Sequence, residues 1–446
     1  MVSASRPDHH SAITRRAIFA QAWPIMLAQA TIPLVGVVDT AVIGRTGDAT
    51  ALAAVALGVA IVNFLVWAFG FLRMGITGLV AQAQGSGQSE EAKALLARGV
   101  LLGGALGAGL FALQWLIVPA ALALMASGGA LDREAAGFIH ARLWGAPALL
   151  AFYSINGWLL GMRRTRQALA LQLVMNGVNM AANIALVWGL GMGVRGIGFG
   201  TAIAEWTALA TGLWLTRDVW RNLPHRAAIL SRPALSRLLA VNRDLMIRTI
   251  ALLTLFTWFT NAGARLGEAE LAAQQVLMQF VSITAFVLDG FCFTAEERVG
   301  SAIGAQSRAD FLRAVRLVAE WCLWAALTFT ALILLAGEPL VALLTTNEEV
   351  RAATAPLLWF VALVPLVGLA SWLLDGVFIG ATEGRALRNA ALFATAAYIA
   401  TDLALRPLGA TGVWLALLVG YAYRALALGF HWPRLLARLA PGRDGA

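Results

Sequence analysis

Long apolar runs separated by short polar stretches follow one another along most of the 446-residue chain. They are longer than the alternating segments of about ten residues that build membrane barrels, and helices are the other structure able to cross hydrocarbon. The pattern therefore predicts twelve membrane-spanning helices. They lie at approximately 18–43, 51–72, 94–119, 135–161, 168–190, 196–216, 247–264, 271–295, 315–336, 353–379, 387–405 and 411–430.

The composition supports the same class. Hydrophobic residues make up 60% of the chain and charged residues 13%, whereas about a quarter of the residues of a soluble domain are charged. The sequence indicates an all-α polytopic membrane protein whose solvent is the lipid bilayer. A net charge of +9 would suggest nucleic acid in a soluble protein, but arginine-rich cytoplasmic loops explain it here. We expect no nucleic-acid partner.

The distribution of basic residues predicts the orientation. An even number of spans places both termini on one side, and 26 of the 33 Lys and Arg residues fall on that side. Because positively charged loops stay in the cytoplasm, we expect both termini to be cytoplasmic and the protein to lie in the inner membrane.

The two halves of the chain resemble each other. GRTGDA (44–49) matches ARLGEA (264–269), NGWLLG (156–161) matches DGVFIG (375–380), and GVRGI (193–197) matches GATGV (409–413), all at nearly the same offset. The repeat predicts an N-lobe (1–216), a basic cytoplasmic linker (217–244) and a C-lobe (245–446). Two like bundles around a cavity are typical of transporters.

Asp39 is the most conspicuous polar residue of the first span. It stands in the apolar stretch PLVGVVDTAVIG (33–44). A lone acid at the centre of a membrane helix costs roughly 2.5–3.5 kcal/mol on insertion scales, and such residues often mark ion or proton paths.

Other polar residues occur on spans 4, 5 and 6. Asn176, Asn179 and Asn183 fall at i, i+3 and i+7, on one helix face. Interhelical hydrogen bonding alone can account for single asparagines, and for Glu205 a structural role and a functional role are equally open. The remaining polar positions of these spans are Tyr153, Ser154 and Asn156 on span 4, Gln172 on span 5 and Thr201 on span 6.

In the second half, Asp289 and Asp375 are each followed by glycine, so capping of nearby backbone is one explanation for them. Glu296 and Glu297 are expected at a solvated helix end. GMGVRG (191–196) has the spacing of a dinucleotide motif without its strand context. No phosphate-binding G-x-x-x-x-G-K-[ST] motif and no metal-binding spacing occur. We therefore expect no cofactor, no metal site and no enzymatic activity.

Four long stretches resemble the multidrug and toxic compound extrusion (MATE) family, and within it the DinF-like branch. They are VDTAVIGRTGDATALAAVALG, FLRMGITGLVAQAQGSG, NGWLLGMRRTRQALALQLVMNGVNM and LDGVFIGATEGRALRNA. The resemblance extends over about residues 15–430. It implies twelve helices in two six-helix lobes, a central cleft, and export of organic compounds in exchange for protons or sodium ions.

The resemblance also implies roles for individual residues. A first-span aspartate of the branch belongs to a polar network in the N-lobe, and matching positions here are Asp39, Asn156, Asn179 and Thr201. The first-span proline at which the helix is thought to bend matches Pro24, with Pro33 as a second bend position.

One position departs from the pattern. Some members carry a second aspartate where this chain has Asn183, which leaves Asp39 as the chief titratable group and Glu205 as its possible substitute. Burial disfavours the charged form of a carboxyl group, so we expect Asp39 to exchange protons. Sodium remains an alternative, because the asparagine face offers several oxygen ligands.

Two other functions stay open from the sequence. A flippase for lipid-linked precursors would line its cleft with several arginines that hold a pyrophosphate. An intramembrane enzyme would need a convergent nucleophile or metal set, and the sequence offers none. We expect a monomeric antiporter whose partners are a small organic substrate and the lipid bilayer.

Overall fold

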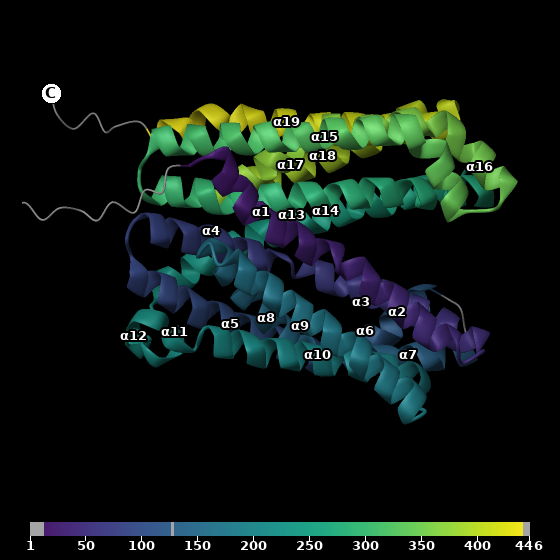
Figure 1. The fold of residues 1–446 in the computed structure, drawn as a ribbon, viewed down its shortest axis with the longest axis horizontal. Helices are drawn as coiled ribbons and strands as arrows, with labels where there is room; N and C mark the ends of the chain where they lie inside the picture. The colour runs from purple at the N-terminus through teal and green to yellow at the C-terminus, as the bar shows by residue number, and fades with distance from the viewer. Residues whose placement is uncertain (1–12, 126–128, 440–446) are drawn as a thin grey trace, which may run out of the picture.

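The computed structural model describes residues 13–125 and 129–439, which are almost entirely helical (Figure 1). The first half contains α1 (Arg15–Ala30), α2 (Ile32–Gly44), α3 (Ala49–Ala68), α4 (Phe71–Gly85), α5 (Ser89–Ala112), α6 (Gln114–Met125), α7 (Ala130–Leu143), α8 (Ala146–Gly161), α9 (Thr165–Ile184), the π-helical turn η1 (Ala185–Gly189) and α10 (Gly193–Leu215). Next come α11 (Arg217–Arg221) and α12 (Arg226–Ile229). The second half contains α13 (Arg232–Ala264), α14 (Glu268–Gly304), α15 (Arg308–Leu344), α16 (Glu348–Thr354), the 3₁₀ turn η2 (Ala355–Leu357), α17 (Leu358–Gly380), α18 (Gly384–Leu405), the 3₁₀ turn η3 (Arg406–Leu408) and α19 (Gly409–Ala437).

Each of the twelve predicted spans corresponds to one helix or to consecutive helices. Spans 1, 2 and 3 are each divided into two helices, and span 4 consists of α7 and α8, bent by 50°. By length and apolarity alone, eight stretches of the described chain can cross a membrane, or nine with that bent pair counted. This count is lower than the twelve predicted spans for two reasons. α18 and α19 form one continuous stretch of 54 residues, and α10 and α13 do not meet the length and apolarity criteria.

The first span is interrupted at Thr31, between α1 and α2. Pro33 lies in the first turn of α2, where its missing N–H costs no intrahelical hydrogen bond. Pro24 lies inside α1, and the helix continues through it. The interruption is therefore associated with Pro33 rather than with Pro24.

Helices of the two halves form two groups, the N-lobe (α1–α10) and the C-lobe (α13–α19). In Figure 1 the C-lobe lies above the N-lobe, and α1 runs along the boundary between them. The short helices α11 and α12 and the end of α19 lie at the same end of the bundle, on the left of the view. We call this the linker end. Arg6 and Arg443, which contributed to the charge distribution, lie outside the described residues.

The linker is attached to the N-lobe by a buried arginine. Arg98 on α5, 3% exposed, donates hydrogen bonds to the backbone oxygens of Ala228 and Ile229 at 2.8 and 2.7 Å and pairs with Glu91 at 2.6 Å. The expected linker 217–244 is largely helical, because α13 already begins at Arg232. The domain limits remain a prediction.

Candidate functional site

Asp39 lies on α2 and faces α9. The side-chain amide of Asn183 donates a hydrogen bond of 2.6 Å from Nδ2 to Asp39 Oδ1. Asp39 is partly exposed, whereas Asn183 is fully buried. Asp39 therefore lies at the edge of a buried polar cluster and is not surrounded by apolar side chains alone.

A chain of hydrogen bonds continues from Asn183 into the N-lobe. Its Nδ2 also donates to Asn179 Oδ1 at 3.2 Å, and Asn179 Nδ2 donates to Thr201 Oγ1 on α10 at 2.9 Å. The Thr201 hydroxyl in turn donates to the backbone oxygen of Ile197 at 2.9 Å. Asp39, Asn179, Asn183 and Thr201, which sequence analysis grouped, thus form one connected network.

The oxygen of the Asn183 amide is the unusual atom of the network. Oδ1 is buried and accepts no hydrogen bond from any described residue. It fits beside Gly200 on α10, where a Cβ would overlap this oxygen. A buried acceptor without a donor costs roughly 1–3 kcal/mol, so the packing of α9 against α10 holds this oxygen at an energetic cost.

The same face of α9 also holds the interruption of the first span. Asn176 Nδ2 donates to Thr31 Oγ1 at 2.7 Å, and Gln172 Nε2 donates to Asn176 Oδ1 at 3.0 Å. Further along, Trp188 in η1 donates to the backbone oxygen of Val42 at 3.0 Å. α9 and the turn η1 that follows it thus contact the first span at three places: at Thr31 just before α2, at Asp39, and near the end of α2.

The structure places three of the expected N-lobe residues outside this network. No hydrogen bond joins Asn156 or Tyr153 to another described residue. Glu205 is 2% exposed and pairs with Arg142 at 2.6 Å. Because its charge is matched by that guanidinium, Glu205 does not share the environment of Asp39.

In the C-lobe, Asp375 on α17 lies between two arginines. Arg248 on α13 and Arg424 on α19 both form ion pairs with it, and Arg424 Nε donates to Asp375 Oδ1 at 3.1 Å. All three side chains are buried. Sequence analysis missed both arginines as partners, although each stands in or next to an apolar run and so requires a buried counter-charge.

Asp289 on α14 lies closer to the boundary between the lobes. It is hydrogen-bonded to Gln29 on α1, and the charges of Arg73, Glu296 and Arg248 act on it. The aspartate therefore belongs to a mixed cluster of charges rather than to a separate carboxylate site.

The expectation that Glu296 and Glu297 form a solvated helix end is wrong. They are 1% and 0% exposed, because α14 continues to Gly304 and packs against α4 and α1. Glu296 pairs with Arg73 at 3.2 Å and Glu297 with Arg163 at 2.6 Å. Both pairs join the N-lobe to the C-lobe.

More polar contacts connect the lobes toward the linker end. Gln21 on α1 donates to Glu297 at 2.9 Å, and Gln82 on α4 donates to the Gly380 backbone oxygen and to Thr382 Oγ1, both at 3.1 Å. The ion pairs between described residues of the two lobes lie in this half of the bundle. The lobes are therefore fastened together at the linker end.

This fold and this polar site define a class, that of a polytopic helical membrane protein with two lobes and a buried carboxylate–amide network. The MatE family model matches residues 24–185 and again residues 245–402, one match in each half of the chain, as the internal repeat predicts. The chain belongs to the MATE family, whose members are transporters and not enzymes.

Curated and solved relatives agree with this assignment. The chain is 37% identical to DNA damage-inducible protein F of Escherichia coli K12 over 422 residues, which cover 94% of this chain and 92% of that protein. The MATE transporter VcmN of Vibrio cholerae in its bent form superposes with a TM-score of 0.85 at 18% identity, covering 95% and 97% of the two chains. A MATE transporter of the MOP superfamily in an outward-facing conformation gives a TM-score of 0.86, also at 18% identity, covering 95% and 96%.

Proposed function

We propose that the protein is a proton-coupled antiporter that exports small organic compounds across the inner membrane, with Asp39 as the coupling group. One observation carries the proposal: the Asp39 carboxylate is bonded to a neutral amide and forms no ion pair with a described residue. Four other acids of the spans, by contrast, are each ion-paired with arginine, namely Glu205, Glu296, Glu297 and Asp375. Binding a proton at Asp39 therefore removes a charge that is not matched by an ion pair with any described residue.

Protonation of Asp39 would change the hydrogen bonds of the Asn183 amide. An ionised carboxylate only accepts hydrogen bonds, and Nδ2 donates to it. A protonated carboxyl group needs an acceptor, and the unpartnered Oδ1 of the same amide becomes one if the amide turns over. The turn withdraws the Nδ2 hydrogen bond from Asn179, so proton uptake at Asp39 alters the network as far as Thr201.

The first span converts that change into motion. α2 is separated from α1 at Thr31. It is held by Asn176 and Asn183 on α9 and by Trp188 in η1. Loss of the charged contact at Asp39 weakens one of these attachments and allows α2 to change its position. Exchange of proton for substrate follows if the two ligands favour different positions of α2.

The ion pairs of the C-lobe favour Asp39, in the N-lobe, as the coupling group. A sodium site there would draw on Asp375, but two arginines already match this carboxylate. In the N-lobe a cation would find one carboxylate and amide oxygens, most of them engaged in hydrogen bonds. This arrangement favours a proton over sodium.

The same ion pairs weigh against a lipid-precursor flippase. Arg73, Arg142, Arg248 and Arg424 have largely buried side chains, and each is paired with an acid. A pyrophosphate would have to compete with these carboxylates. Arginines that are already neutralised hold an anionic head group poorly.

The position of the interlobe contacts suggests which side is closed. If the linker end is cytoplasmic, as the basic residues predict, the pairs Arg73–Glu296 and Arg163–Glu297 close the cytoplasmic side. The conformation described here is then the one that accepts a proton from outside.

Transport in proteoliposomes tests the proposal. Purified protein is reconstituted with ethidium as the probe, and efflux is driven by an imposed pH gradient with and without sodium. We expect efflux to follow the proton gradient, to stop with a protonophore and to ignore a sodium gradient alone. Efflux that depends strictly on sodium and does not respond to the protonophore would rule out the proton.

A further inference from the structure

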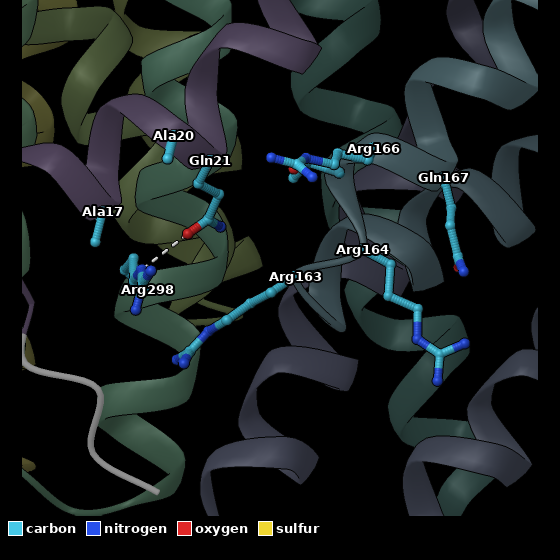
Figure 2. A pocket seen from close by; sticks show the side chains of 9 residues that line it. Ala17, Ala20, Gln21, Arg163, Arg164, Arg166, Gln167 and Arg298 are labelled. Atoms are coloured by element: carbon cyan, nitrogen blue, oxygen red, sulfur yellow. Dashed lines mark hydrogen bonds between the residues drawn. The ribbon is translucent and has the colours of Figure 1, made fainter.

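A cavity of about 460 Å³ opens at the linker end, between α1, the start of α9 and α14 (Figure 2). It lies where the two lobes meet. Gln21 comes from α1, Arg163, Arg164 and Arg166 come from the α8–α9 turn and the first turn of α9, and Arg298 comes from α14. None of its lining residues belongs to the network around Asp39.

The cavity carries a strong excess of positive charge. Its four arginines stand against one carboxylate, Glu297, which is fully buried behind the lining and binds Arg163 at 2.6 Å and Gln21 at 2.9 Å. Arg164 stacks on Trp158 with its guanidinium 5.1 Å from the ring centroid. Among the described residues, Arg166 has no carboxylate partner.

Arg298 is the side chain that indicates a ligand. It is only 7% exposed, yet of its guanidinium nitrogens only Nε donates to a described residue, namely to Gln21 Oε1 at 2.8 Å. The nearest carboxylate, Glu297, is 3.6 Å away from that same nitrogen. Its terminal nitrogens adjoin the cavity and remain available as donors (Figure 2).

The backbone at the start of α9 adds to the positive electrostatic potential of the cavity. α9 begins at Thr165, whose side chain is 5% exposed and lines the cavity. The first N–H groups of a helix have no partner within the helix, and together with its dipole they favour an anion. No acidic residue lies in this first turn of α9.

We propose that this cavity binds a phosphate group, with Arg166 and Arg298 as its principal donors and the start of α9 behind it. Arginine is suited to phosphate because its planar donors match two oxygens at once. A phospholipid with a net negative charge is one source of the group, and free phosphate is the other. With the linker end cytoplasmic, which is part of the proposed function, the lipid would come from the inner leaflet.

The surroundings favour the lipid. Phe19 and Trp23 on α1 are 43% and 37% exposed, close along the helix to Ala20, which lines the cavity. Tryptophan is enriched at the level of lipid head groups, and such apolar side chains can contact acyl chains while the phosphate enters the cavity.

Occupancy would have a structural consequence. The donors come from both lobes, Arg166 from the N-lobe and Arg298 from the C-lobe. A ligand that bridges them adds to the contacts of Gln21 and Arg163 with Glu297 and stabilises the closed linker end. The bound anion therefore favours one conformation of the transporter.

Thermal unfolding in detergent tests the site without any transport measurement, so its outcome is independent of the coupling mechanism. A ligand that binds only the folded protein raises the melting temperature with its concentration. Phosphatidylglycerol, phosphatidylcholine and inorganic phosphate are titrated against the wild type, Arg166→Gln and Arg313→Gln. Arg313 is an exposed arginine near the start of α15 and serves as the control.

We expect phosphatidylglycerol to stabilise the wild type and Arg313→Gln equally, with about tenfold weaker binding to Arg166→Gln, the typical effect of losing one charged hydrogen bond. Stabilisation by inorganic phosphate with the same dependence on Arg166 also supports the site and assigns it to a soluble anion. The proposal is overturned if neither anion stabilises the wild type more than phosphatidylcholine does, or if both variants respond like the wild type.

Discussion

A single amide nitrogen, Asn183 Nδ2, donates to both the Asp39 carboxylate at 2.6 Å and Asn179 Oδ1 at 3.2 Å, while the amide oxygen has no donor. The charge on α2 and the polar face of α9 thus depend on the orientation of one side chain. This relationship yields the first two predictions.

Asp39→Asn is expected to abolish coupled transport while the protein still folds and inserts. The substitution keeps the shape but removes the group that can gain and lose a proton. Ethidium efflux in proteoliposomes measures the effect, and thermal unfolding checks the fold. Asp218→Asn, at an exposed position of α11, is the control and should transport like the wild type. Wild-type efflux by Asp39→Asn would show that the coupling role is wrong.

Gly200→Ala is expected to reduce transport and to destabilise the protein by about 1–3 kcal/mol, as overpacking typically does. The new Cβ would overlap Asn183 Oδ1, so the amide must leave its position beside Asp39. Gly177→Ala is the matched control, because a Cβ at that position of α9 meets open space. Melting temperature and efflux are measured for both variants; equal behaviour of the two would contradict the importance of this packing.

Removing the carboxylate of the Asp375 cluster is expected to destabilise the protein strongly. Asp375→Asn leaves two buried guanidinium groups without their ion-pair partner, whereas Arg424→Met keeps the Asp375–Arg248 pair and should cost less. Breaking a buried pair typically costs about 3–5 kcal/mol. Arg316→Gln is the control, since its pair with Glu320 is exposed and surface pairs contribute little. A melting temperature unchanged in Asp375→Asn would show that the cluster is not needed for stability.

Cysteine labelling tests the orientation. Ser86 follows α4 and Ser231 precedes α13, both at the linker end, whereas Ala130 begins α7 at the other end of the bundle. Single cysteines at the first two positions should react with an impermeant thiol reagent only from the cytoplasm, and one at Ala130 only from outside. The native Cys292 and Cys322 are buried and should give little background. Labelling of Ser231→Cys from outside would reverse the assigned topology.

The local pattern of the sequence was sufficient to predict the helices, because a run of apolar residues long enough to cross hydrocarbon has no other stable structure there. It also predicted the face of α9. The spacing of Asn176, Asn179 and Asn183 follows the helical period, and the three side chains do lie together in the structure. The repeat was visible for the same reason: it is a property of the chain and not of its packing.

The partners of buried charges could not be predicted from the local sequence pattern. Glu297 was expected to be solvated. It is buried against Gln21 and Arg163, which lie far away in the sequence and reach it because the two lobes pack together. Asp375 meets Arg248 and Arg424 for a similar reason. A single chain position shows that a charge is present in an apolar run, but hydrogen-bond geometry between distant helices decides whether that charge is matched.

The same distinction separates Asp39 from Glu205. The sequence by itself determined that Asp39 is a carboxylate in an apolar helix, which has an energetic cost in any fold. Only the tertiary structure decided that its partner is the amide of Asn183, while Glu205 received Arg142. The physical reason is that the charge of an ionisable group is set by the groups within a few ångströms of it, and helix packing alone brings those groups together.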